Sequence, residues 1–313
     1  MQSTQDLKRR MKSVHNIGQI TKAMELVAAT KMRKAQELAL DSRPYSYAAL
    51  ELLGVLSELK DVPRPPLLEK RPVARTAFLI VTSDKGLAGA FNSAVIRKFE
   101  QYARAEKIDV ADPGQSFIAV GQKARAYLAR QKANIAASFT RAGDYTRMEE
   151  VRPMADALIE GYLRGDFDRV IAFYTTFVTA LRQDAVMREF LPIDLEAIKQ
   201  SIEETIPRAG RYSEYARSES FLKDDGRADY IIEPTPSEVL AELAPRLLTV
   251  RIYNAILEAN ASEHSARRMA MRNASDNAAE LSQNLNIEYN KSRQAAITNQ
   301  IIEVTSGAQS LSS

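Results

Sequence analysis

Residues 6–36 read DLKRRMKSVHNIGQITKAMELVAATKMRKAQ, and apolar residues recur along them at steps of three and four. This spacing is that of one face of an α-helix. The apolar residues are Leu7, Met11, Val14, Ile17, Ile20, Met24 and Val27. The first proline is Pro44, which can bend the helix or begin a new one, and the PRPP run at 63–66 ends the segment. The sequence predicts one long amphipathic helix within residues 1–59.

A second long helix is predicted at the other end of the chain, within residues 236–309. From Ser237 to Ser306 the only proline is Pro245, and no glycine occurs before Gly307. Ser237 is the expected N-cap and Gly307 the expected stop, so the helix is about 100 Å long at about 1.5 Å per residue. Two sets of residues repeat at sevens and form its expected seam: Leu257, His264, Met271, Ala278 and Leu285, and Tyr253, Asn260, Arg267, Ala274 and Leu281.

These terminal helices are expected to pair as a long antiparallel coiled coil. Their seam contains few large apolar residues, because Asn260 and Arg267 are polar and much of the rest is alanine. Alanine buries little apolar area at about 25 cal/mol per Å². The exposed faces of such a pair are therefore expected to bind a partner.

The middle of the chain alternates short apolar runs with helical stretches. The runs are TAFLIV from Thr76, SFIAVG from Ser116, NIAAS from Asn134, RVIAFYTT from Arg169 and AVMREFLPI from Ala185. Helical stretches are expected near 92–106, 122–131 and 149–164. This alternation predicts an α/β fold with a parallel sheet covered on both faces, a Rossmann-like doubly wound domain over 72–195. Residues 196–235 are polar and are expected to form a flexible excursion.

Composition excludes several kinds of site. Cysteine is absent, which removes disulfides and thiolate nucleophiles, and His15 and His264 are interpreted as polar seam residues rather than metal ligands. No apolar run is long enough to span a membrane, and the first ten residues lack the apolar core of a signal peptide. Residues 1–34 carry eight Lys and Arg against Asp6 and Glu25, a net charge of +6 (8 − 2), which could face nucleic acid, anionic lipid or acidic protein.

The stretch SDKGLAGAFN, Ser83–Asn92, follows an expected strand and opens an expected helix, where doubly wound proteins bind phosphates. The spacing of Gly86 and Gly89 does not fit GxGxxG, and no GxxxxGK followed by Ser or Thr occurs. A tight turn stabilised by Asp84 is favoured over nucleotide binding, which leaves Lys85 available to a partner. No catalytic motif appears elsewhere in the chain.

Three stretches together resemble one family. They are ITKAM, VAA and KMRKAQ within 6–36, SDKGLAGAFN, and residues 270–307 with DNA, YN, RQAAIT and the start of SGA. On these motifs the chain resembles the gamma subunits of F-type ATP synthases over nearly its whole length. The family commonly has GLCGG where this chain has GLAGA. Because the chain contains no cysteine, a thiol switch like that of chloroplast gamma subunits is excluded.

The resemblance implies a central stalk (rotor) subunit that couples ion-driven c-ring rotation to ATP synthesis or hydrolysis, with no active site, cofactor or metal of its own. Its implied partners are the alpha and beta subunits, the epsilon subunit and the c-ring, and not nucleic acid or a small-molecule substrate. The implied location is peripheral, on the cytoplasmic face of the bacterial plasma membrane.

The resemblance also implies site residues. Met24, Arg293, Gln294 and Thr298 correspond to coupling contacts with beta subunits, and Arg33, Lys34 and Lys85 to positions facing acidic beta residues. Tyr230 and Glu233 of ADYIIEP are similar to a family segment near the epsilon subunit and the c-ring.

Two alternatives stay open from the residues alone. A free coiled-coil adaptor could use the basic arm on nucleic acid or lipid, although this explains nothing of the C-terminal helix. A Rossmann-type enzyme would bind a nucleotide at Ser83–Asn92.

Overall fold

The computed structural model describes residues 4–42, 44, 45, 48, 49, 52, 55, 56, 63–140, 146–194 and 232–311. Most of the expected excursion, residues 196–231, lies outside the described residues. The chain divides into two compact units. Residues 1–28 and 267–313 form the first, here called the two-helix unit, and residues 29–266 form the second, here called the sheet unit.

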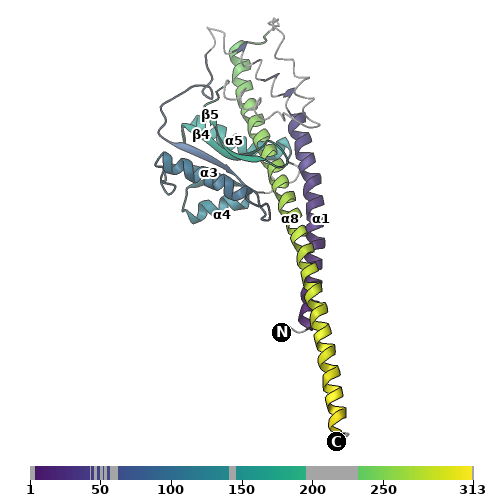
Figure 1. Cartoon of the computed structure of the whole chain (residues 1–313). Helices are drawn as coiled ribbons and strands as arrows, with labels where there is room; N and C mark the ends of the chain where they lie inside the picture. Colours follow the sequence, from purple (N-terminus) through teal and green to yellow (C-terminus); the bar gives the residue numbers. More distant parts are fainter. Residues whose placement is uncertain are drawn as a thin grey trace. The chain divides into compact units, whose positions relative to one another are not determined.

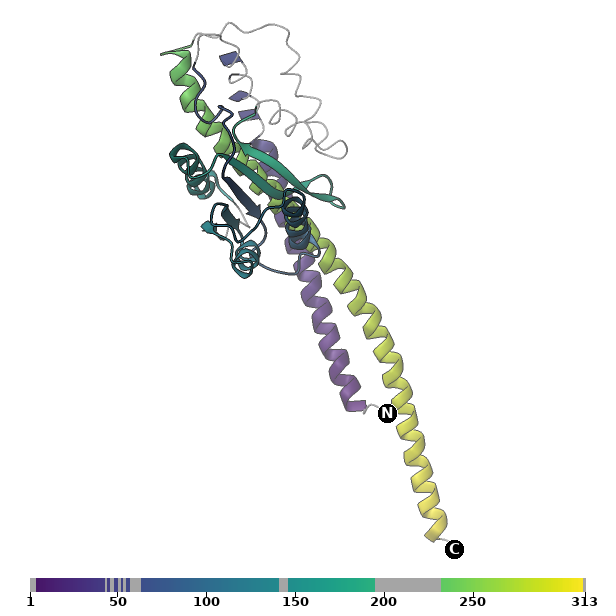
Figure 2. The ribbon, with the colours of Figure 1, turned by 90° about the vertical axis from the view of Figure 1, so that its left-hand side faces the viewer.

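Two long helices are present, as the sequence predicts. Helix α1 spans Thr4–Asp41 and helix α8 spans Pro236–Leu311. They run antiparallel side by side, with the start of α1 and the end of α8 at the same end in both views (Figures 1 and 2). Helix α1 ends before Pro44, because proline disfavours helical backbone at the residue that precedes it.

Both expected ends of α8 were wrong by a few residues. The cap at its start is Thr235, whose Oγ1 accepts a hydrogen bond from the backbone N–H of Glu238 at 3.3 Å, and Pro236 occupies the first helical position, where its missing N–H costs nothing. Gly307 does not stop the helix, which continues to Leu311. Glycine costs only about 1 kcal/mol relative to alanine inside a helix, too little to end one alone.

The sheet has five strands in the order β3-β2-β1-β4-β5. Their bounds are Thr76–Val81 for β1, Ser116–Val120 for β2, Ile135–Phe139 for β3, Arg169–Phe177 for β4 and Gln183–Leu191 for β5. Strands β1 to β4 are mutually parallel, with Phe78 of β1 level with Phe117 of β2 and Ile171 of β4. This is the predicted doubly wound order, in which the chain reverses its direction of winding between β1 and β4.

Strand β5 departs from the expected all-parallel sheet, because it pairs antiparallel with β4. Only residues 178–182 join the two strands. A parallel return needs a crossover of about a dozen residues or more, so this short connection forces a hairpin.

Helices cover both faces of the sheet, as expected. Helices α3 (Phe91–Ala105) and α4 (Gln122–Arg130) pack on one face, and α5 (Met148–Arg164) with the first part of α8 on the other (Figure 1). Alternate residues of β1 face the two cores: Phe78 and Ile80 face α3 and α4, and Leu79 and Val81 face α5 and α8. Strand β1 is therefore buried on both faces and fixed in register from both sides.

Candidate partner-binding surface

The seam of the two-helix unit combines large apolar side chains with small and polar ones. On α1 the inward positions follow at alternating steps of four and three: Leu7, Met11, Val14, Gly18, Thr21, Glu25 and Ala28, all buried or half-buried. Facing them on α8 are Met271, Ser275, Ala278, Ser282 and Leu285. The predicted heptad through Met271, Ala278 and Leu285 is confirmed, since all three side chains are buried.

Part of the predicted apolar stripe on α1 lies outside this seam. Ile17, Ile20 and Val27 are exposed by 50%, 60% and 55%, and Met24 is half-buried. From Val14 the stripe advances by two successive steps of three residues, and each such step turns about 60° short of a full circle. The stripe therefore drifts onto the flank of the helix, while the seam continues through Gly18 and Thr21.

The second seam position on α8 was also assigned wrongly. Leu281 is 44% exposed and Ala274 is half-buried, whereas Ser275 and Ser282 lie in the seam, lining a groove of about 430 Å³ with Val14 and Gly18. Several large apolar side chains thus lie on the outside of the two-helix unit, while part of the seam between the helices is filled by small ones. Helix pairs that are stable alone have the opposite arrangement.

Glu25 is the charged residue of this seam. Its carboxylate accepts a hydrogen bond from Lys22 Nζ at 2.9 Å, and that bond, together with the positive charges of Arg272 and Arg268 on α8, lowers the pKa of Glu25 below its usual value of 4.5. The ionised side chain therefore links the two helices electrostatically at neutral pH.

The end of α8 extends beyond the start of α1. Gly18 lies opposite Ala278, so Thr4 lies opposite about Ser292 (4 + 292 = 18 + 278). From Ala296 to Thr305 every described side chain is exposed, and the large apolar ones among them are Ile297, Ile301, Ile302 and Val304. Figures 1 and 2 both show this last part of α8 without a companion helix among the described residues.

The coupling positions named from the resemblance all lie on accessible parts of the two-helix unit. Arg293, Gln294 and Thr298 are exposed, and the Thr298 hydroxyl donates to the carbonyl of Gln294 at 2.9 Å. Met24 lies opposite Arg272 in the antiparallel register (24 + 272 = 18 + 278). Because 21 residues (293 − 272) separate Arg272 from Arg293, Met24 lies about 31 Å from the Arg293 group along the axis. The structure therefore does not bring these two groups together.

The turn at Ser83–Asn92 is held by the chain's own polar groups. The Asn92 side chain accepts from Ser83 N–H at 2.9 Å and donates to Ser83 Oγ at 2.8 Å. The Asp84 carboxylate accepts from the backbone N–H of Gln122, at the start of α4, at 2.9 Å. Asp84 thus occupies the position where an anion would bind that helix N-terminus. The geometry is that of a tight turn, and the Lys85 side chain is exposed upon it.

Two further cationic positions lie on the part of α1 that belongs to the sheet unit. Arg33 and Lys34 are both exposed, and Lys34 makes a surface ion pair with Glu37 at 3.5 Å. Such exposed ion pairs stabilise a protein by less than about 1 kcal/mol. Lys34 can therefore exchange Glu37 for an acidic residue of a partner at little cost. Glu233 is exposed just before α8, and Tyr230 lies outside the described residues.

The two histidines are placed differently. His264 is buried, whereas His15 is exposed beside Gln19, with 3.1 Å between His15 Nε2 and Gln19 Nε2, and it lines the groove along the seam with Val14 and Gly18. Within the described part of the chain, no cluster of three or more His, Asp or Glu is arranged to hold a metal ion. None of the described helices carries an apolar stretch long enough to cross a membrane.

Comparison with known proteins identifies similar chains of the same length. A family model described as ATP synthase matches residues 3–311. A protein named ATP synthase gamma chain from Roseiflexus castenholzii is 39% identical over 315 residues, which cover 99% of each chain. The fold matches two chains from Euglena gracilis mitochondrial ATP synthase. One, from a structure titled rotor, has a TM-score of 0.58 at 20% identity and covers 94% of this chain and 98% of the other. The second, titled OSCP/F1/c-ring, has a TM-score of 0.63 at 19% identity over 98% and 94%.

Proposed function

Because this chain belongs to the ATP synthase gamma chain family, we propose that its two-helix unit turns inside a ring of alpha and beta subunits as the shaft of the rotor. The shaft couples c-ring rotation to ATP synthesis or hydrolysis and performs no chemistry itself. Its further contacts are the epsilon subunit and the c-ring, and it acts at the cytoplasmic face of a bacterial plasma membrane as a peripheral component. Neither nucleic acid nor a small molecule is its ligand.

The observation that carries this proposal is the row of large apolar side chains exposed on the outside of the two-helix unit, beside a seam that small residues partly fill. Ile17, Ile20 and Val27 are half-exposed or more, while Gly18 and Ala278 fill the seam between the helices. Exposed apolar groups in such a row favour a protein partner that removes them from water. A sleeve around both helices would cover them on α1 and on the end of α8 together.

A rotating shaft also needs contacts that hold no single orientation strongly. The outer residues are aliphatic and charged, without large aromatic side chains among the exposed apolar groups of α1 and of residues 267–305 in α8. Aromatic anchors that fill deep pockets dominate tight interfaces. Shallow aliphatic contacts and exposed charge pairs suit a surface that meets several equivalent partners in turn.

Reconstitution tests the proposal. Purified chain is mixed with alpha and beta subunits, and both assembly and ATP hydrolysis are measured for the native chain and for an Ile17→Ser, Ile20→Ser, Val27→Ser variant. The variant should assemble more weakly, since each substitution removes apolar burial worth about 1 to 2 kcal/mol. The matched control is Asn16→Ser with Gln19→Ser, at exposed polar positions of the same helix segment. Equal assembly of the variant and the control would contradict the proposal.

A further inference from the structure

Strand β5 is an edge strand of the sheet that the described residues form. It has nine residues, whereas β3 at the opposite edge has five, and no strand among the described residues pairs with its outer side. Its ladder with β4 is regular from the Ile171–Glu189 pair to the Phe177–Gln183 pair. Proteins usually shorten or interrupt such edges, because the unpaired backbone N–H and C=O groups recruit other strands. A long regular edge strand is therefore expected to pair with a strand of another chain.

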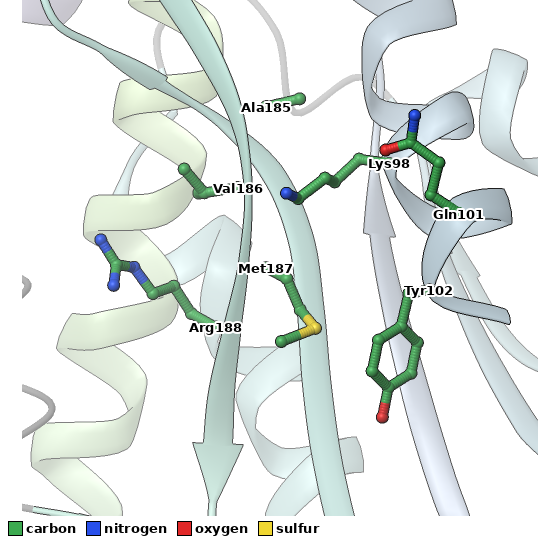
Figure 3. Close-up of a pocket in the computed structure, with 7 residues that line it drawn as sticks. All are labelled: Lys98, Gln101, Tyr102, Ala185, Val186, Met187 and Arg188. Atoms are coloured by element: carbon green, nitrogen blue, oxygen red, sulfur yellow. The ribbon is translucent and has the colours of Figure 1, made fainter. Parts of the chain in front are cut away.

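A groove of about 370 Å³ follows this edge (Figure 3). Its lining residues are Lys98, Gln101 and Tyr102 from α3 and the consecutive residues 185–188 from β5. Successive side chains of a strand point to opposite faces, and Figure 3 shows Met187 toward α3 and Arg188 away from it. A groove lined by four consecutive residues therefore runs along the strand's edge and gives access to its backbone.

A lysine without a described partner lies beside the groove. Lys98 extends its ammonium group from α3 toward β5 (Figure 3), and it forms no ion pair or hydrogen bond with any described residue. Between this cation and the strand lie the apolar side chains of Ala185 and Met187, and Met187 is 40% exposed. The groove thus offers backbone pairing, apolar contact and the exposed ammonium group of Lys98, which together complement an extended segment carrying a carboxylate.

We propose that β5 accepts an extended, carboxylate-bearing segment of another chain of the same complex, which adds to the sheet as a sixth strand and pairs its carboxylate with Lys98. This inference rests on the proposed function, since it takes the partner from the ATP synthase assembly. Main-chain hydrogen bonds supply the affinity of such strand addition, and the pockets for alternate side chains supply its specificity. The contact fastens the sheet unit to its neighbour without using the two-helix unit.

Photo-crosslinking in the assembled complex tests this inference. A benzoylphenylalanine replaces Met187, whose partial exposure tolerates a larger side chain, and a second version carries it at Gln101. The purified complex is irradiated, and the joined peptides are identified by mass spectrometry. Both positions should join to one segment that contains Asp or Glu and belongs to a different chain. The Lys98→Glu substitution should lower the yield about fivefold through charge repulsion, and Lys123→Glu, at an exposed lysine of α4, should leave it unchanged.

Other outcomes overturn the inference in distinguishable ways. A complex that assembles and hydrolyses ATP but gives no product at either position contradicts strand addition while leaving the proposed function intact. Products with a second copy of this chain, or an unchanged yield in Lys98→Glu, contradict the stated partner. A chain that fails to join the other subunits at all contradicts the proposed function and the inference with it.

Discussion

Gly18 of α1 lies directly against Ala278 of α8, so that a Cβ placed on Gly18 would be 3.5 Å from the Cβ of Ala278. The two helices approach each other over these small residues, and the adjoining Ile17 and Ile20 are exposed. At these positions the pair buries little apolar area between its own helices, and Ile17 and Ile20 remain exposed where a partner can cover them.

The first prediction is a disulfide between these two positions. Their Cβ separation lies at the short end of the range of about 3.5–4.5 Å that disulfides require, and the chain has no cysteine to compete. The Gly18→Cys, Ala278→Cys variant should oxidise fully under mild conditions and migrate faster on a non-reducing gel. The Ile17→Cys, Ala278→Cys variant should stay reduced, because Ile17 is on the flank. Equal oxidation of both pairs would contradict the observed register.

The second prediction concerns Glu25 and pH. Because Lys22, Arg272 and Arg268 lower its pKa from 4.5, ionised Glu25 stabilises the helix pair above that usual pKa, and the stabilisation is lost as the pH falls through the lowered value. Glu25→Gln should therefore melt earlier than the native chain at pH 7, by circular dichroism, and the difference should close as the pH falls through the lowered pKa of Glu25. Glu280→Gln, at an exposed site of α8, is the control. A difference that persists in acid would rule out this electrostatic role.

The third prediction separates the two neighbouring charges of the Ser83–Asn92 turn. Asp84→Ala removes the acceptor for the Gln122 N–H and should destabilise the sheet unit by about 1 kcal/mol in urea unfolding. Lys85→Ala should change stability by less than about 0.5 kcal/mol while weakening assembly with beta subunits. The reverse pattern would assign Lys85 to the fold and Asp84 to the partner.

The fourth prediction concerns Met24→Lys. The half-buried position on the flank lets a lysine extend its ammonium group outward, so the chain should fold and assemble. Inside the ring the added cation would lie near Arg272, which is opposite Met24 in the antiparallel register, and should reduce proton pumping more than ATP hydrolysis. Asn16→Lys, at an exposed polar position, serves as the control. An unaltered ratio of protons pumped to ATP hydrolysed would argue against a coupling role for Met24.

The fifth prediction concerns the exposed end of α8. Arg293→Ala with Gln294→Ala removes two side chains that are exposed in this structure, so the melting temperature of the chain should not change measurably. Coupling in the assembled complex should fall nonetheless, because both side chains face the proposed ring. Loss of folded sheet by circular dichroism would instead make these residues structural.

Much of the fold could be predicted from periodicity alone. Helices α3, α4 and α5 begin and end within one residue of the expected stretches, because each is bounded by turn residues and buries one regular apolar face. The antiparallel course of β5 was missed since the apolar run from Ala185 is the same for either direction. It is the short connection at 178–182 that decides the direction.

The seam was harder to predict, because it depends on how two helices meet. Ile17, Ile20 and Leu281 fit an apolar repeat in the sequence. The helices nevertheless pack through Gly18 and Ser282, because these smaller residues permit a closer approach of the two backbones. Repeated three-residue steps were the available signal that the stripe drifts away from the seam. The positions named from the family motifs could be located on the surface, but no sequence pattern states what they touch.

Single-molecule rotation tests the central claim most directly. A bead is attached to the sheet unit through a Lys123→Cys substitution in complexes whose alpha and beta subunits are fixed to glass, and ATP is added. Steady rotation of the bead in one direction is expected, because the whole chain turns as the rotor. A bead that stays fixed in complexes that hydrolyse ATP would contradict it.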